Sequence, residues 1–145
     1  MSAAPSPAQL TLHKLPHRVP FVLIDRVVAF DGRSARFLKA VTRNDALLGG
    51  WPTIPPTLIL EAMAQAAGML VAGVEQSTAL LLLVAADDVY FHAPVRAGAQ
   101  LVLEVVLERT RPPFYVVGTR ALVGEEARAE GRLTLARESA SRPVD

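Results

Sequence analysis

The sequence contains no cysteine among its 145 residues, so disulfides, thiol catalysis and thiolate metal sites are excluded. Lysine is scarce as well: it occurs only at Lys14 and Lys39, and the other 13 of the 15 basic residues are arginines. The net charge is +1, which gives no bulk attraction to a nucleic acid. Histidine occurs three times, at His13, His17 and His92, without the spacing of a metal site. We therefore expect no metal, no other cofactor and no nucleic-acid partner.

A long uncharged hydrophobic run is also missing. The longest apolar stretch, residues 58–74, is interrupted by Glu61 and Gln65 and is shorter than the roughly 20 residues of a membrane span. Residues 1–9 lack the basic and apolar regions of a signal peptide. We therefore expect a cytoplasmic protein that does not enter a membrane.

The sequence does contain enough apolar residues for one folded domain. Hydrophobic residues make up 51% and charged residues 20%, which excludes intrinsic disorder. Chains of this length commonly form one domain. We expect a single domain over residues 1–145, with a flexible leader at 1–7 and a flexible tail at 138–145.

Hydrophobic periodicity predicts one long helix and several strands. The helix is expected at 57–75, begun either by Thr57 as the N-cap or by Pro56 at the first helical position. A short helix is expected at 8–15, and a long loop rich in Gly and Pro at 42–56. The strands are expected at 21–30, 34–41, 79–86, 101–109, 114–123 and 127–136.

The helix at 57–75 is too hydrophobic to lie on a surface, so the antiparallel sheet must wrap around it. One buried helix wrapped by one sheet is the hotdog architecture, of the α+β class. The continuous apolar run at 79–86 is typical of a strand that is buried on both faces. Such a sheet leaves an edge and an open side of the helix, and we expect two copies to pair and cover both.

Two segments carry a resemblance to a known family. Residues 15–27 read Leu-Pro-His-Arg-Val-Pro-Phe-Val-Leu-Ile-Asp-Arg-Val, and residues 58–68 read Leu-Ile-Leu-Glu-Ala-Met-Ala-Gln-Ala-Ala-Gly. A weaker match begins at residues 88–95. With these motifs the chain resembles the beta-hydroxyacyl-acyl-carrier-protein dehydratases of the FabZ and FabA type, over residues 15–136. The resemblance implies a dimer of hotdogs that acts on acyl thioesters in fatty-acid or polyketide-type biosynthesis.

The resemblance also implies the parts of an active site. In the family, a histidine in a G-H-F-P-x-x-P-x-M-P-G loop removes the α-proton, a helix glutamate helps to expel the β-hydroxyl, and backbone N–H groups near the helix start polarise the thioester carbonyl. Glu61 matches the glutamate and is the candidate acid or base. Gly50 stands where the resemblance places the histidine. Pro56, which has no N–H, stands at the last glycine of the loop.

Further candidates lie in or near the matched motifs. His17 is the candidate substitute for the missing base, although a plain turn histidine is the alternative. Glu61 could likewise be a structural carboxylate that pairs with an arginine across a dimer interface. The residues expected to bind the substrate are Gln65, Gly50, Trp51, Pro52, Arg18, Phe91 and His92.

Four functions stay open at this point. The first is a dehydratase that uses Glu61 with water or His17 as the base. The second is a catalytically incomplete subunit that pairs with an active homologue, and the third is a thioesterase. The fourth is a protein that binds acyl thioesters without catalysis. We expect the partner to be acyl-carrier protein or a coenzyme A thioester. We expect the chain to form a homodimer, a heterodimer with a dehydratase homologue, or a higher oligomer.

Overall fold

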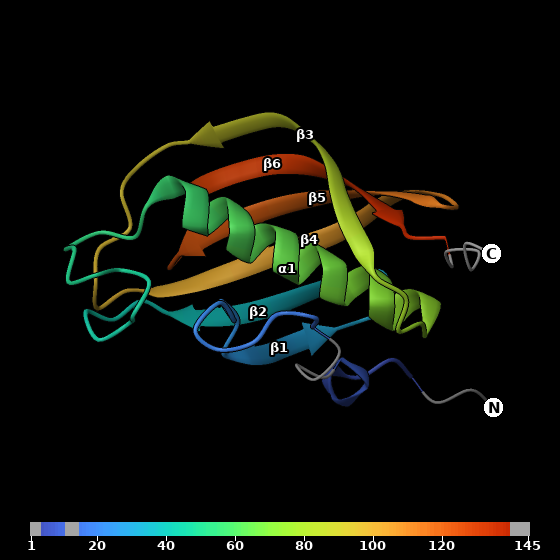
Figure 1. Cartoon of the computed structure of the whole chain (residues 1–145), viewed down its shortest axis with the longest axis horizontal. Helices are drawn as coiled ribbons and strands as arrows, with labels where there is room; N and C mark the ends of the chain where they lie inside the picture. The colour runs from blue at the N-terminus through green and yellow to red at the C-terminus, as the bar shows by residue number, and fades with distance from the viewer. Residues whose placement is uncertain (1–3, 11–14, 140–145) are drawn as a thin grey trace, which may run out of the picture.

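The structure of the chain, a computed structural model, describes residues 4–10 and 15–139. One long helix, α1, lies against a single antiparallel sheet of six strands (Figure 1). The sheet order is β1-β2-β4-β5-β6-β3, so β1 and β3 form its two edges. In chain order the elements are the 3-10 helix η1 (Pro7–Gln9), β1 (Arg26–Phe30), β2 (Ser34–Ala40), α1 (Pro56–Glu75), β3 (Leu81–Phe91), β4 (Gln100–Arg111), β5 (Phe114–Val123) and β6 (Glu126–Arg137).

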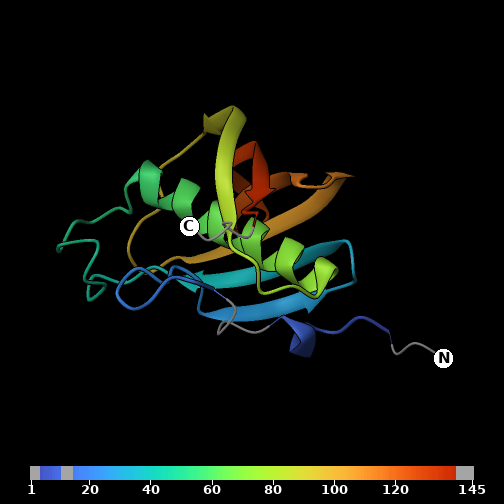
Figure 2. The same cartoon turned by 45° about the vertical axis from the view of Figure 1, so that its right-hand side comes forward.

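The sheet curves around α1, as Figure 2 shows, and the predicted wrapping of the helix is confirmed. Strand β4 shows how the sequence produces this curved inner face. Leu101, Leu103, Val105 and Leu107 are all buried, while Glu104 between them lies on the outer face. Because side chains alternate along a strand, this sequence can put only one of its faces against the helix.

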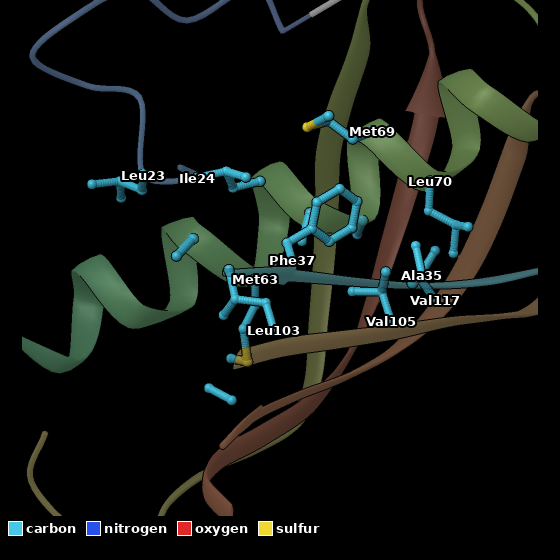
Figure 3. Close-up of a cluster of buried hydrophobic side chains, with 14 of the residues drawn as sticks. Leu23, Ile24, Ala35, Phe37, Met63, Met69, Leu70, Leu103, Val105 and Val117 are labelled. Atoms are coloured by element: carbon cyan, nitrogen blue, oxygen red, sulfur yellow. The ribbon is translucent and has the colours of Figure 1, made fainter. Parts of the chain in front are cut away.

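The core lies between α1 and the inner face of the sheet. Figure 3 shows Met63 and Leu70 of the helix among side chains of the sheet that include Phe37 and Leu103. All four side chains are fully buried. Burial of each such side chain contributes about 1.5–3 kcal/mol to folding.

The helix begins and ends where local backbone chemistry allows. Its first residue is Pro56, as one of the two predictions had it, and the N-cap is Pro55 rather than Thr57. Proline suits the first position because that N–H has no partner within a helix. The helix ends at Glu75, and its C-cap Gln76 has a left-handed φ of 50° and an N–H that bonds to the carbonyl of Ala72. The helix is long and apolar enough to cross a membrane, but 56% of its most apolar window is buried inside the molecule.

The N-terminal third differs from the predicted elements. The predicted strand at 21–30 begins only at Arg26, because the backbone of Phe21 and Leu23 bonds to the side chain of Gln65 instead of to a strand. Of the predicted helix at 8–15, the described residues 8–10 contain the end of the 3-10 helix η1, and residues 11–14 lie outside the described residues. The ends of the predicted leader and tail, residues 1–3 and 140–145, also lie outside them.

Strand β3 corrects the prediction for residues 79–86. That run is not buried on both faces, because β3 is an edge strand that pairs only with β6. Leu82, Leu83 and Val84 are each more than two-fifths exposed. A continuous apolar run predicts burial, but among residues 4–10 and 15–139 no strand pairs with the outer edge of β3.

Candidate active site

Glu61 lies in the second turn of α1, on a helix face that lines a cavity of about 700 Å3. The cavity is bounded by α1, by residues 15–18 and by the start of β3 with the residues before it. Glu61 is the one carboxylate among the described residues that line it. The apolar part of the wall is formed by Leu15, Pro16, Ala64, Met69, Ala79, Leu80, Leu81, Leu82, Leu83 and Leu135. The cavity therefore offers an apolar chain a place beside a single acidic group.

His17 meets Glu61 although the two residues are far apart in the sequence. The Nε2 atom of His17 lies 3.1 Å from Oε1 of Glu61, and both side chains are about three-tenths exposed. The imidazole ring also packs near the ring of Phe21, with 5.9 Å between centroids. Its other nitrogen, Nδ1, is buried and has no hydrogen-bond partner among the described residues. His17 therefore lines the cavity in direct contact with Glu61.

Gln65 lies one helical turn after Glu61 and is buried. Its Nε2 donates to Oε1 of Glu61 at 3.1 Å and to the carbonyl of Phe21 at 2.8 Å. Its Oε1 accepts the N–H of Leu23 at 2.9 Å. One amide thus joins the helix to the segment that follows His17.

Arg18 lines the same cavity beside His17. Its Nη1 donates to the carbonyls of Leu15 and His17, at 2.8 Å and 2.9 Å. These bonds brace the turn that carries His17, and they leave other guanidinium donors of Arg18 for a ligand.

The loop residues predicted to bind substrate lie outside the cavity. Gly50, Trp51 and Pro52 are exposed and do not line it. Gly50 has a φ of 80°, a left-handed conformation that strains any residue with a side chain. The backbone at this position therefore favours glycine.

Phe91 and His92 also lie away from Glu61. The cavity is bounded by the start of β3, whereas Phe91 is the last residue of that strand and His92 follows it. His92 is exposed, and its Nε2 lies 3.7 Å from Oε1 of Glu130. The structure thus brings together His17, Arg18, Glu61 and Gln65, and leaves the other predicted site residues elsewhere. His13 lies outside the described residues.

Sequence reasoning missed the far wall of the cavity, residues 78–83. Their apolar run was visible, but it was interpreted as a strand buried on both faces. It also missed the backbone of Phe21 and Leu23 as partners of Gln65, for which the sequence carries no signal. In residues 4–10 and 15–139, no three His, Cys, Asp or Glu side chains gather where they could hold a metal ion.

The start of α1 offers few free N–H groups. Pro55 and Pro56 have none. The N–H groups of Leu58 and Ile59 both bond to the carbonyl of Pro55, at 2.9 Å and 3.2 Å. Within the described part of the chain, the N–H of Thr57 is then the one first-turn donor without a partner.

Comparison with known proteins places this chain in a family. The FabA-like domain matches residues 15–131, which include both His17 and Glu61. The chain belongs to the FabA-like family, among its FabZ-type dehydratases. The 3-hydroxyacyl-[acyl-carrier-protein] dehydratase FabZ of Albidiferax ferrireducens is 41% identical over 134 residues, covering 86% of this chain and 89% of that protein. The FabZ of Lactococcus lactis subsp. cremoris is 37% identical over 130 residues, covering 86% and 90%.

Comparison with solved structures confirms the predicted hotdog fold. The dehydratase heterocomplex ApeI:P from Xenorhabdus doucetiae matches with a TM-score of 0.76 at 20% identity, over 87% of this chain and 89% of that chain. The PaaI protein of E. coli, from the phenylacetic acid degradation operon, matches with a TM-score of 0.67 at 16% identity, over 83% of each chain. At these identities the likeness shows the fold alone.

Proposed function

We propose that this chain is a dehydratase of 3-hydroxyacyl thioesters in which Glu61 removes the α-proton and returns it to the leaving β-hydroxyl. The observation that carries the proposal is the position of Glu61, which is the one carboxylate in the described lining of a largely apolar cavity and is in contact with His17. Carboxylates in such surroundings are suited to general acid and base catalysis. The FabZ-type relatives named above support the substrate class.

The proposed reaction needs only one group that takes and returns a proton. Glu61 accepts the α-proton, and the electrons of the C–H bond form the double bond between the α- and β-carbons. The C–O bond of the β-hydroxyl breaks, and the hydroxyl leaves as water with the proton that Glu61 returns. Nε2 of His17 lies beside Oε1 of Glu61, and the Thr57 N–H is the available backbone donor for the thioester carbonyl.

This mechanism differs from the one that the resemblance implies, because it uses no histidine in the loop at 49–56. Support for the difference comes from Gly50, which is exposed and left-handed. It also comes from Pro56, which provides no N–H at the helix start. We propose that the catalytic loop has diverged and that Glu61, in the second turn of α1, carries out the proton transfers.

Mass spectrometry of a 3-hydroxyacyl-carrier-protein incubated with the purified chain tests the proposal. We expect the acyl group to lose one water, and Glu61→Gln to slow this by about a hundredfold or more. Glu125→Gln, an exposed change in the turn between β5 and β6, is the matched control and should leave the rate unchanged. Release of the free acid would identify a thioesterase instead. Unchanged acyl-carrier protein with a folded chain would reject catalysis by this chain alone.

The depth of the cavity predicts which acyl chains are accepted. Gly68 lines the cavity about 10 Å along α1 from Glu61. A Cβ there would meet no atom within 4 Å, so a larger side chain would fill open space. Gly68→Leu should reduce turnover of long-chain thioesters by about tenfold or more and leave 3-hydroxybutyryl thioesters unaffected. Equal loss for short and long chains would show that the acyl group lies elsewhere.

A second candidate is a subunit that completes its site by pairing with a homologue. The observation that favours it is the exposed edge strand β3, with Leu82, Val84, Tyr90 and Phe91 uncovered. The neighbour from Xenorhabdus is itself a dehydratase heterocomplex. Native mass spectrometry of the chain, alone and with a FabZ that retains the loop histidine, distinguishes the two. Dehydration that appears only in the mixed species would favour the paired subunit.

A further inference from the structure

Gln65 has a buried amide whose orientation is decided by its neighbours. The Leu23 N–H can only donate, so it must face the amide oxygen, and the Phe21 carbonyl can only accept, so it must face the amide nitrogen. The two bonds agree on one orientation of the amide. The group that Gln65 presents to Glu61 is therefore an N–H.

This orientation determines which oxygen of Glu61 is available for chemistry. Because Oε1 accepts the N–H of Gln65 at 3.1 Å, it carries no proton on that side. The same Oε1 also lies 3.1 Å from Nε2 of His17, so both neighbours of Glu61 crowd this one oxygen. Among the described residues Oε2 has no hydrogen-bond partner, which leaves it free for a substrate.

The amide of Gln65 has no donor left for a substrate. An amide nitrogen has two N–H groups, and both are used, one by Phe21 and one by Glu61. At 2% exposure the side chain is also out of contact with solvent. A substrate contact through this N–H2 group, as expected from the sequence, would require one of these bonds to break.

We infer that Gln65 is a positioning residue that locks Oε1 of Glu61 and the turn that carries His17, so that the proton is exchanged at Oε2. This inference rests on the proposed function for its catalytic part. Gln65 connects two segments that share no backbone pairing, since Phe21 and Leu23 precede β1 and Glu61 lies in α1. Buried polar networks of this kind are worth more than their single bonds suggest, because each member holds the others in place.

Gln65→Met tests the inference, because methionine keeps the length of the side chain and removes all three hydrogen bonds. We expect kcat for dehydration to fall about a hundredfold while KM changes little, as for a misplaced catalytic group. We expect the Leu23 amide to lose its protection from hydrogen exchange, and the nitrogen NMR signals of His17 to change. Gln100→Met, an exposed glutamine at the start of β4, is the control and should change none of these.

Gln65→Glu is the second variant, and it keeps the acceptor for Leu23. It also places a second carboxylate beside Glu61, where the other charged or titratable groups among the described lining residues are His17 and Arg18. We expect the acidic limb of the pH–rate profile to move to higher pH, because like charges disfavour ionisation. A role in folding alone would lower the melting temperature without moving that limb.

The outcomes separate the inference from the proposed function. A folded Gln65→Met with unchanged kcat and an unchanged pH profile would overturn the positioning role. A wild-type chain that dehydrates nothing would overturn the proposed function, and the Leu23 and His17 signals would still test what Gln65 holds. If the Leu23 and His17 signals are unchanged in both Gln65 variants, the inference is overturned whether or not the wild-type chain is active.

Discussion

Strand β2 carries one cation on each face of the sheet, and the two are held in opposite ways. Lys39 points inward and is 7% exposed, and its Nζ lies 2.7 Å from Oδ2 of Asp45 at 14% exposure. Arg36 points outward and is 51% exposed, and its Nε lies 3.4 Å from Oε2 of Glu104. The residue types are similar, but only the inner pair is removed from water.

The comparison shows that position, rather than charge, decides what an ion pair contributes. Exposed pairs contribute little because water screens them and their side chains lose entropy. A buried pair constrains the structure strongly, because removing one partner leaves the other charged and desolvated. Lys39 and Asp45 hold the first part of the loop after β2, and Asp45 also accepts the N–H of Leu47 at 3.1 Å.

The largest expected effect breaks the inner pair. Asp45→Ala leaves Lys39 buried without a partner, and we expect the free energy of unfolding to fall by about 3 kcal/mol. Chemical denaturation followed by circular dichroism measures it. The double variant Lys39→Met with Asp45→Leu should recover most of the loss, because it removes both charges. A loss under 1 kcal/mol in Asp45→Ala, on the same scale as exposed pairs, would contradict the comparison.

The pH dependence of the inner pair sharpens the comparison. Burial raises the pKa of Asp45, but the hydrogen bonds from Lys39 and the Leu47 N–H and the charge of Lys39 outweigh it, so the pKa lies below its ordinary value. A lowered pKa stabilises the folded state above the unfolded pKa, and this stabilisation is lost as the pH falls through the folded one. The stability difference between wild type and Asp45→Asn should therefore be full above about pH 5 and shrink below it. A stability difference between the two proteins that stays constant as the pH falls would contradict the lowered pKa of Asp45.

A buried group without any partner provides the intermediate case. The Tyr115 side chain is fully buried, and its hydroxyl finds no partner within residues 4–10 and 15–139. Tyr115→Phe should therefore change the free energy of unfolding by about 1 kcal/mol or less, toward greater stability. Thermal denaturation measures the change. A clear destabilisation would mean that the hydroxyl has a bound water as its partner.

The smallest expected effect is on the outer face. Glu104 lies between Arg36 and Arg120, at 3.4 Å and 3.7 Å. Glu104→Gln should change the free energy of unfolding by about 0.5 kcal/mol or less, and added salt should reduce even that. Denaturation at low and high salt checks both points. An effect as large as that of Asp45→Ala would show that the outer charges form a cooperative network.

Much of the fold could be predicted from the sequence, because it follows from local periodicity. The helix over 57–75 was placed within one residue, and the strand at 114–123 matches β5. The position of Gln65 one turn after Glu61 is a property of the helix alone. These features depend on backbone geometry, which repeats over a few residues and leaves a visible pattern.

The candidate site was predictable only in part. Glu61 followed from its helix and from the family resemblance, and His17, Arg18 and Gln65 were expected from the same motifs, but the loop around Gly50 was expected as well. The structure places His17, Arg18 and Gln65 around Glu61 and leaves Trp51 and His92 elsewhere. No pattern of spacing could have shown that the backbone of residues 21–23 would bond to a helix side chain.

The sequence by itself determined the helix, the alternation of the strands, the family and the presence of a carboxylate inside an apolar helix. Only the tertiary structure decided that His17 reaches Glu61, that Lys39 is buried while Arg36 is exposed, and that β3 is an uncovered edge. The reason is physical. Helix and strand periods are local properties of the backbone, whereas burial and contacts between distant segments depend on how the whole chain closes around its core.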